Sequence, residues 1–201
     1  MEFEFKGNRL KLEKELSNLD KLVLLFVKVL DQQHVDYVII SGYIAILFGR
    51  SRQTDDVDLF VEEMPFEKFA GLWAVLEGAG FECINAATAE SAYYEYLKDE
   101  LAIRFAVKGT RIPNFELKFP KSDLSKYSLQ NKIIVEIRNE IQLIKTSKLE
   151  LQIAYKLYMS SDKDLEDAIH LWHLFKSSIN QDLFWGFIIR LNAQDKVKVL
   201  E

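Results

Sequence analysis

The chain has 201 residues, of which 49% are hydrophobic, and its formal net charge is −5. This length and apolar content allow a buried core, which excludes global disorder and fits one domain or a domain with a helical extension. The acidic balance does not favour broad binding to a nucleic-acid backbone, so no strong nucleic-acid footprint is expected, although a local basic groove is compatible with it.

The first 146 residues alternate helical and extended patterns. Apolar residues recur at helical spacing over 19–32, and a β-branched run over 35–40 stops at the Ser41–Gly42 turn. Pro65 suits the first turn of a helix, where the N–H that proline lacks would be unpaired anyway. In chain order the patterns predict a helix over 19–32, a strand over 35–40, a helix over 43–48, a strand over 57–61, a helix over 66–77, and strands over 81–84, 101–107, 115–119, 132–138 and 140–145, while 87–96 is ambiguous with helix slightly favoured.

The character of the chain changes at about Ser147. Helical periodicity holds over 149–159, 165–175 and 183–199, and Ser161 or Asp162 can cap the middle helix. The expected fold class is α+β, with a mixed β-sheet core over residues 1–146 that is flanked by helices. A helical C-terminal region over residues 147–201 is expected to pack on that core.

The sequence carries no sign of export or membrane insertion. Residues 1–6 lack the charge pattern and apolar run of a signal peptide. The longest apolar runs, 22–30 and 37–48, are shorter than the roughly 18 residues that suggest a membrane span. The single cysteine, Cys83, allows neither a disulfide framework nor a cysteine zinc cluster within one chain. We therefore expect a cytoplasmic protein with no membrane partner.

Asp56 and Asp58 lie two residues apart at the strand predicted over 57–61. Alternation sends both carboxylates to one face, which Phe60 shares. Two carboxylates this close repel each other unless a cation or water relieves them, and Mg²⁺ (or Mn²⁺) binds such oxygen ligands together with substrate phosphates. A solvated strand entrance is the alternative, because an Asp-x-Asp pair alone is a weak signal.

The residues around this pair resemble the signature of the DNA-polymerase-β-like nucleotidyltransferase superfamily. That signature is an apolar strand, a Gly-Gly or Gly-Ser turn, a helix, and then Asp-x-Asp on a second strand. Ser41 replaces the usual first glycine, and the rest follow in the register of bacterial and archaeal members: Gly42, Gly49, Arg52, Thr54, Asp56 and Asp58. The resemblance implies a nucleoside triphosphate substrate, a metal held by the Asp pair, and phosphates positioned by Ser41, Gly42, Arg52 and Thr54.

In that superfamily a third carboxylate, usually Asp, stands on a later strand, and Glu116 is the candidate here. Over 115–119, alternation puts Glu116 and Lys118 on the face opposite Phe115 and Leu117. By the resemblance, Glu116 helps bind a second metal and promotes deprotonation of the acceptor. A surface Glu–Lys pair on an edge strand is the alternative. Weaker candidates for the third carboxylate are Glu82, Glu95 and Glu100.

The C-terminal helices carry a second resemblance. Residues 151–157 and 163–168 resemble the later motifs of the abortive-infection toxin nucleotidyltransferases and their minimal nucleotidyltransferase-like relatives. By that resemblance, Lys156 contacts the phosphates, and Asp164 or Asp167 orients Lys156 or the acceptor. The alternatives are a snorkelling lysine and carboxylates that stabilise the first turn of a helix.

Two further groups have weaker functional interpretations. Arg50 is an alternative to Arg52 as a phosphate clamp, because a guanidinium pairs well with phosphate oxygens. His170 and His173 are spaced for a zinc pair, but no second ligand cluster accompanies them, which favours helix packing.

The resulting hypothesis is a metal-dependent nucleotidyltransferase that moves an NMP from an NTP to an acceptor hydroxyl. The acceptor is a protein, an RNA end or a small molecule, and the resemblance adds a toxin–antitoxin context with an antitoxin partner. The alternative is a catalytically weak protein of the same fold that binds a nucleotide or a partner chain.

Overall fold

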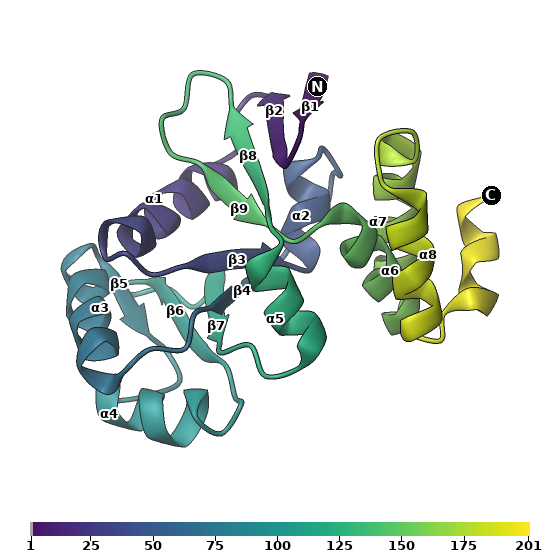
Figure 1. Cartoon of the computed structure of the whole chain (residues 1–201). Coiled ribbons are helices and arrows are strands. Elements are labelled where there is room, and N and C mark those ends of the chain that lie inside the picture. The colour runs from purple at the N-terminus through teal and green to yellow at the C-terminus, as the bar shows by residue number, and fades with distance from the viewer. Residues whose placement is uncertain (1) are drawn as a thin grey trace.

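The computed structural model describes residues 2–201 (Figure 1). Over this range the strands form one nine-stranded mixed sheet in the order β1-β2-β8-β9-β3-β4-β7-β6-β5. The strands are β1 (Glu2–Lys6), β2 (Arg9–Glu13), β3 (Tyr37–Ile40), β4 (Asp56–Val61), β5 (Phe81–Cys83), β6 (Ile103–Val107), β7 (Asn114–Lys118), β8 (Ile133–Ile137) and β9 (Ile144–Thr146). The pairs β2–β8, β9–β3 and β4–β7 are parallel and the other neighbours are antiparallel.

Helices flank the sheet, and three of them lie together on one side of it in Figure 1, namely α6 (Leu149–Met159), α7 (Asp162–Phe175) and α8 (Gln181–Arg190). The others are α1 (Asn18–Gln32), α2 (Gly42–Leu47), α3 (Phe66–Gly78), α4 (Ala89–Ser91), the π-helical turn η1 (Ala92–Leu97), α5 (Asp123–Gln130) and the 3₁₀ segment η2 (Gln194–Leu200). The expected α+β class with a mixed sheet is confirmed. The division into residues 1–146 and 147–201 stays a prediction.

One part of the core lies between α1 and the sheet, and the same buried cluster continues into α2, α3, α6, α7 and α8. Ser17 and Asp20 form a capping box that starts α1, so the first helical N–H groups are satisfied. Phe26, on the buried face of α1, stacks on Phe115 of β7 with ring centroids 3.9 Å apart. Because side chains alternate along a strand, burying Phe115 and Leu117 here turns Glu116 to the opposite face of the sheet.

Most expected elements are present, with three corrections. The sequence analysis did not identify β1, β2 or α5, although Arg9–Glu13 alternates exposed charges with fully buried Leu10 and Leu12. The helix expected over 183–199 ends at Arg190, because Asn192 adopts a positive φ of 53° that a right-handed helix does not allow. The ambiguous segment 87–96 forms α4 and η1. Across residues 2–201, no helix combines the length and the hydropathy that crossing a membrane requires.

Candidate nucleotide-transfer site

The two aspartates lie on β4, with their side chains on the face opposite the core. Val57, Leu59 and Val61 are buried on the other face, so the alternation that the sequence predicts for β4 is observed. Asp58 pairs in register with Ile40 of β3 on one side and Glu116 of β7 on the other. The Thr54 hydroxyl lies 3.3 Å from Asp56 Oδ1 and 3.1 Å from the Asp56 carbonyl oxygen. Thr54 therefore fixes the entry to β4 rather than projecting freely into the site.

The negative charge of the aspartate pair is only partly compensated by the protein. Burial raises the pKa of Asp58 to about 6, and the charges of Asp56 and Glu116 act in the same direction. Lys118 and a hydrogen bond from the Ser41 side chain oppose this rise without cancelling it. A carboxyl whose pKa stays well above its ordinary value is one whose negative charge the protein does not fully compensate. This environment favours an added cation.

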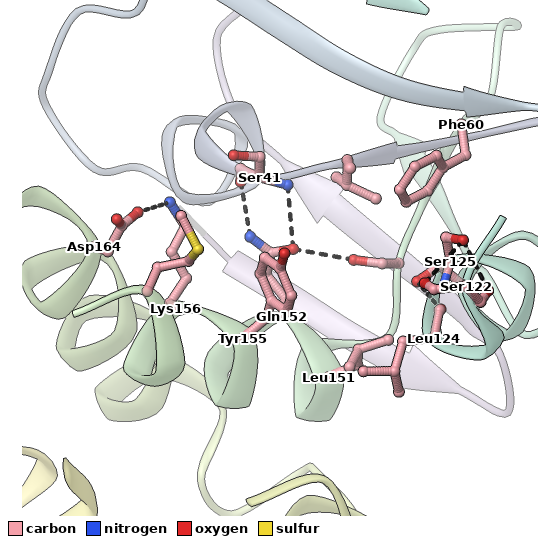
Figure 2. Close-up of a pocket in the computed structure, with 14 residues that line it drawn as sticks. Ser41, Phe60, Ser122, Leu124, Ser125, Leu151, Gln152, Tyr155, Lys156 and Asp164 are labelled. Carbon is pink, nitrogen blue, oxygen red and sulfur yellow. Dashed lines mark hydrogen bonds and ion pairs between the residues drawn. The ribbon is translucent and has the colours of Figure 1, made fainter. Parts of the chain in front are cut away.

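The Ser41–Gly42 turn is held in an unusual backbone conformation. Ser41 has φ 65° and ψ −139°, a region that residues other than glycine rarely adopt. Gln152 of α6 secures it from both sides: the Ser41 N–H donates to Gln152 Oε1 at 3.2 Å, and Gln152 Nε2 donates to the Ser41 carbonyl at 2.8 Å (Figure 2). Ser147 also donates to Gln152 Oε1 at 3.2 Å. The backbone N–H of Ser41 is thus already engaged by the protein.

The Tyr43 side chain anchors the start of α2 to α1. Its hydroxyl donates to Oδ1 of the fully buried Asp20 at 2.8 Å. Lys14 forms an ion pair with the same carboxylate at 2.8 Å. Burial opposes ionisation of Asp20, but the bonds from Lys14 and Ser17 outweigh it and hold its pKa below the ordinary value. The residue that follows Gly42 is therefore tied to the capping box of α1.

Arg52 lies against Gly42 and reaches across to α7. A Cβ placed on Gly42 would lie 2.4 Å from Arg52 Nη2, so a larger residue here would force the end of the Arg52 side chain to shift. The guanidinium forms a fork with Asp167, with Nε 3.0 Å from Oδ1 and Nη2 2.9 Å from Oδ2. Such planar bidentate pairing is specific to arginine.

Asp167 is the centre of an ionic group that we call the Asp167 cluster, made of half-buried Arg50 and Arg52 and buried Lys156, Asp164 and Asp167. Asp167 is fully buried and accepts from Arg50 at 2.5 Å and from Lys156 at 2.9 Å. Lys156 also bonds Asp164 at 2.7 Å. Burial opposes ionisation of Asp167, but the bonds from Arg52 and Lys156 outweigh it and hold its pKa below the ordinary value. The cations that the sequence assigned to phosphates are therefore paired with carboxylates.

Glu116 lies beside the aspartates but is bound to other partners. Arg104 of β6, which is opposite Glu116 in register, donates from Nε to Glu116 Oε1 at 2.6 Å. Lys118 Nζ lies 3.5 Å from Glu116 Oε2. Among residues 2–201, no three His, Cys, Asp or Glu side chains are grouped as a metal site would need. The role of Glu116 as the third carboxylate stays a prediction.

His170 packs between helices, as the sequence analysis favoured. Its Nε2 lies 3.0 Å from the carbonyl oxygen of Phe48, which ends α2. The contact ties α7 to the end of the helix that follows the Ser41–Gly42 turn.

Comparisons with known proteins place this arrangement on a familiar fold. No family model matches the sequence, and no curated protein matches it. Among solved structures, a crystal structure of an antigenic nucleotidyltransferase-like protein from Paracoccidioides brasiliensis is 20% identical with a TM-score of 0.52, over 92% of this chain and 94% of that chain. The solution structure of the antibiotic-resistance factor ANT(2'')-Ia is 10% identical with a TM-score of 0.54, over 90% of this chain and 96% of that chain. This chain has the nucleotidyltransferase fold.

A second structure of that factor agrees. ANT(2'')-Ia in complex with adenylyl-2''-tobramycin is 15% identical with a TM-score of 0.52, over 87% of this chain and 99% of that chain. At identities this low, the structural likeness shows the nucleotidyltransferase fold alone, and the abortive-infection toxin branch stays a prediction.

On this nucleotidyltransferase fold, the chemistry of the donor set fits one divalent cation better than two. Asp56 and Asp58 supply oxygen ligands on one face, and burial together with the charge of Asp56 raises the pKa of Asp58 in spite of Lys118. Mg²⁺ is usually bound by one or two carboxylates together with substrate phosphates. Asp56 and Asp58 can provide the carboxylates. Glu116 differs, because Arg104 pairs with its Oε1 and Lys118 lies 3.5 Å from its Oε2.

A cavity of about 180 Å³ opens beside the Ser41 turn, between α5, α6 and the sheet (Figure 2). Phe60, two residues beyond Asp58 on the same face of β4, forms part of one wall. The lining residues are Ile40, Ser41, Phe60, Ser122, Leu124, Ser125, Ser128, Ser147, Leu151, Gln152, Tyr155, Lys156, Met159 and Asp164. The sequence analysis missed Gln152, whose one signal was an amide among apolar neighbours on a buried helix.

Proposed function

We propose that this chain transfers a nucleoside monophosphate from a nucleoside triphosphate to an acceptor hydroxyl, with Mg²⁺ or Mn²⁺ as cofactor. The observation that supports this most directly is the pair of Asp56 and Asp58 beside the Ser41–Gly42 turn on a nucleotidyltransferase fold. Burial, with the charge of Asp56, raises the pKa of Asp58 to about 6, and perturbed pKa values of this kind cluster at functional sites.

Asp56 and Asp58 hold the metal in this proposal. When bound there, the metal supplies electrostatic stabilisation of the charge that develops on the phosphates. Ser41, through its hydroxyl, and Gly42, through close backbone approach, position the triphosphate. Arg52 and Thr54 brace this turn and the start of β4, and Lys156 with Asp164 borders the cavity next to it.

The acceptor oxygen forms a bond to the α-phosphorus as the bond to the leaving pyrophosphate breaks. We assign the acceptor's proton to Oε2 of Glu116, which is in register with Asp58 on the neighbouring strand. Arg104 holds Oε1, whereas Lys118 approaches Oε2 only to 3.5 Å. Holding the reacting oxygen and the α-phosphate in line is the main contribution of such a site, because the reaction needs little covalent help from the protein.

The cavity beside Ser41 supports a nucleoside site. Its volume of about 180 Å³ suits a nucleobase, and Phe60 offers an aromatic wall on the strand that carries the aspartates. The acceptor that we favour is a small molecule, because one structural neighbour is in complex with adenylyl-2''-tobramycin. A protein hydroxyl and an RNA end are the remaining acceptor classes. A toxin–antitoxin role, with an antitoxin partner, is supported by the sequence resemblance alone.

The test uses each of the four α-labelled triphosphates with Mg²⁺ and three acceptor fractions of a cell extract: small molecules, protein and RNA. We expect label in one fraction, and loss of that label in Asp56→Asn and Asp58→Asn proteins. Asp55→Asn is the matched control, because Asp55 is adjacent in sequence but exposed. Transfer that survives Asp58→Asn would overturn the site, and no transfer from any triphosphate to any fraction would overturn the activity.

A nucleotide-binding protein without transfer is the second candidate, and one observation favours it. Arg52 and Lys156 are neutralised by Asp167 and Asp164, and the Ser41 N–H is bonded to Gln152. Fewer unpaired hydrogen-bond donors and cations then remain to bind the phosphates of a triphosphate. Calorimetric binding of a triphosphate in the presence of Mg²⁺, without transfer of label, would support this candidate.

A further inference from the structure

Lys118 lies between the carboxylates of two neighbouring strands. Its Nζ is 3.5 Å from Glu116 Oε2 on its own strand β7 and 3.9 Å from Asp58 Oδ1 on β4. The parallel register explains this position, because Asp58 is opposite Glu116 and Phe60 is opposite Lys118. Both distances exceed an ordinary hydrogen bond, so the ammonium acts as a charge shared by the two carboxylates.

The low exposure of the two carboxylates strengthens their interaction with the Lys118 charge. The Asp58 and Glu116 side chains are only 20% and 10% exposed, so the charge of Lys118 is poorly screened by water. Arg104 holds Glu116 Oε1 from the other side, which leaves Oε2 directed to Lys118. Lys118 is 37% exposed, so the end of its side chain has room to adjust.

We propose that the Lys118 ammonium occupies the place where a second divalent cation would bridge Asp58 and Glu116. The chain then binds one divalent cation, at Asp56 and Asp58, and Lys118 supplies the second positive charge. This inference rests on the proposed function. A lysine suits the position because its ammonium is a compact point charge on a flexible stem.

The consequence for the reaction is a fixed charge on the side of the site that faces β7. A two-metal site neutralises the attacking and the leaving oxygens with two ions about 3.5–4 Å apart. Here the protein itself provides the charge next to Glu116, and only the ion at Asp56 and Asp58 comes from solution. Lys118 is therefore a positioning residue for Glu116 and Asp58, and it limits the number of metal ions bound.

The test counts bound Mn²⁺ by electron paramagnetic resonance, with a non-hydrolysable triphosphate analogue present so that no turnover is needed. We expect one Mn²⁺ per chain in the wild type. Lys118→Met frees Glu116 Oε2 and Asp58 Oδ1 for a second ion, so this protein should bind two. Lys118→Arg keeps the charge and should stay at one. Lys108→Met is the control, because Lys108 is exposed just beyond the end of β6.

Each outcome separates this inference from the proposed function. Two Mn²⁺ ions in the wild type, or one in a folded Lys118→Met protein, would overturn the role of Lys118 and leave nucleotidyl transfer standing. No bound Mn²⁺ in any protein would overturn the metal site of the proposed function as well. Thermal unfolding checks that each variant is folded before its ions are counted.

Discussion

The Arg52 guanidinium lies directly against the Cα of Gly42 and forks onto Asp167 of α7. One side chain thus spans the turn beside the aspartate pair and the helices of the C-terminal region. The contact in this position depends on glycine at 42, because a Cβ there would displace the guanidinium. The glycine that a sequence motif assigns to phosphate approach therefore also serves to admit Arg52.

Gly42→Ala should destabilise the protein by about 1–3 kcal/mol, the usual cost of forcing a bulkier group into packed surroundings. Gly71→Ala is the matched control, because Gly71 lies in α3 with open space around it. That substitution should stabilise the helix by roughly 0.5–1 kcal/mol. Urea unfolding of both proteins measures the two changes. If Gly42→Ala changed the free energy of unfolding by the same amount as Gly71→Ala, Arg52 would move aside without cost.

Asp167→Asn should destabilise the protein far more, by about 3–5 kcal/mol, because it leaves the buried Lys156 and the half-buried Arg50 and Arg52 beside a neutral partner. Glu166 provides the comparison, since it pairs with the same Arg50 but its side chain is 65% exposed. Glu166→Gln should cost less than about 1 kcal/mol, as exposed ion pairs do. The free energies of unfolding from urea titrations test this contrast. A small change for Asp167→Asn would show that the Asp167 cluster adds little to stability.

The features that could be predicted from sequence are those with local signals. Alternation along β4 and β7 placed Asp56, Asp58 and Glu116 on the face opposite Val57, Leu59, Phe115 and Leu117. The burial pattern of β4 has that alternation, whereas in β7 Glu116 is buried as well, because β4 and β6 flank it. The α+β class followed from the change of pattern near Ser147. The short strand β2 also alternates, but five residues near the N-terminus gave too little pattern to identify it.

The partners of the charged residues could not be predicted. Arg52 and Asp167 are 115 positions apart, and their pairing depends on how α7 packs on the rest of the chain. The same holds for Gln152 and Ser41, at 111 positions apart. A motif states which residue type is present, whereas tertiary packing decides whether its charge is free for a ligand or used by the protein.

Gln152→Ala should weaken use of the triphosphate. It removes both bonds to Ser41, whose backbone conformation is one that residues other than glycine rarely hold unaided. If the turn positions phosphates, its relaxation should lower kcat/KM for the triphosphate by about 10- to 100-fold. Gln181→Ala is the control, since Gln181 also donates to a backbone carbonyl but lies exposed on α8. Unchanged kinetics in a folded Gln152→Ala protein would contradict this role.

Asp58→Asn should stabilise the metal-free protein above about pH 6. Burial raises the pKa of Asp58 from 3.8 to about 6, so between these values the folded chain holds a proton that the unfolded chain releases. The wild type therefore loses stability as the pH rises through this window, by about 3 kcal/mol in total, and an asparagine avoids the loss.

Unfolding in EDTA at pH 4 and pH 7.5 tests this, with Asp55→Asn as the control. The gap in stability between Asp58→Asn and the wild type should open with rising pH. Mg²⁺ should narrow it, because a bound cation stabilises only the protein that keeps the carboxylate. A gap that does not change between the two pH values would contradict the raised pKa, and with it the view that the protein only partly compensates the charge of Asp56 and Asp58.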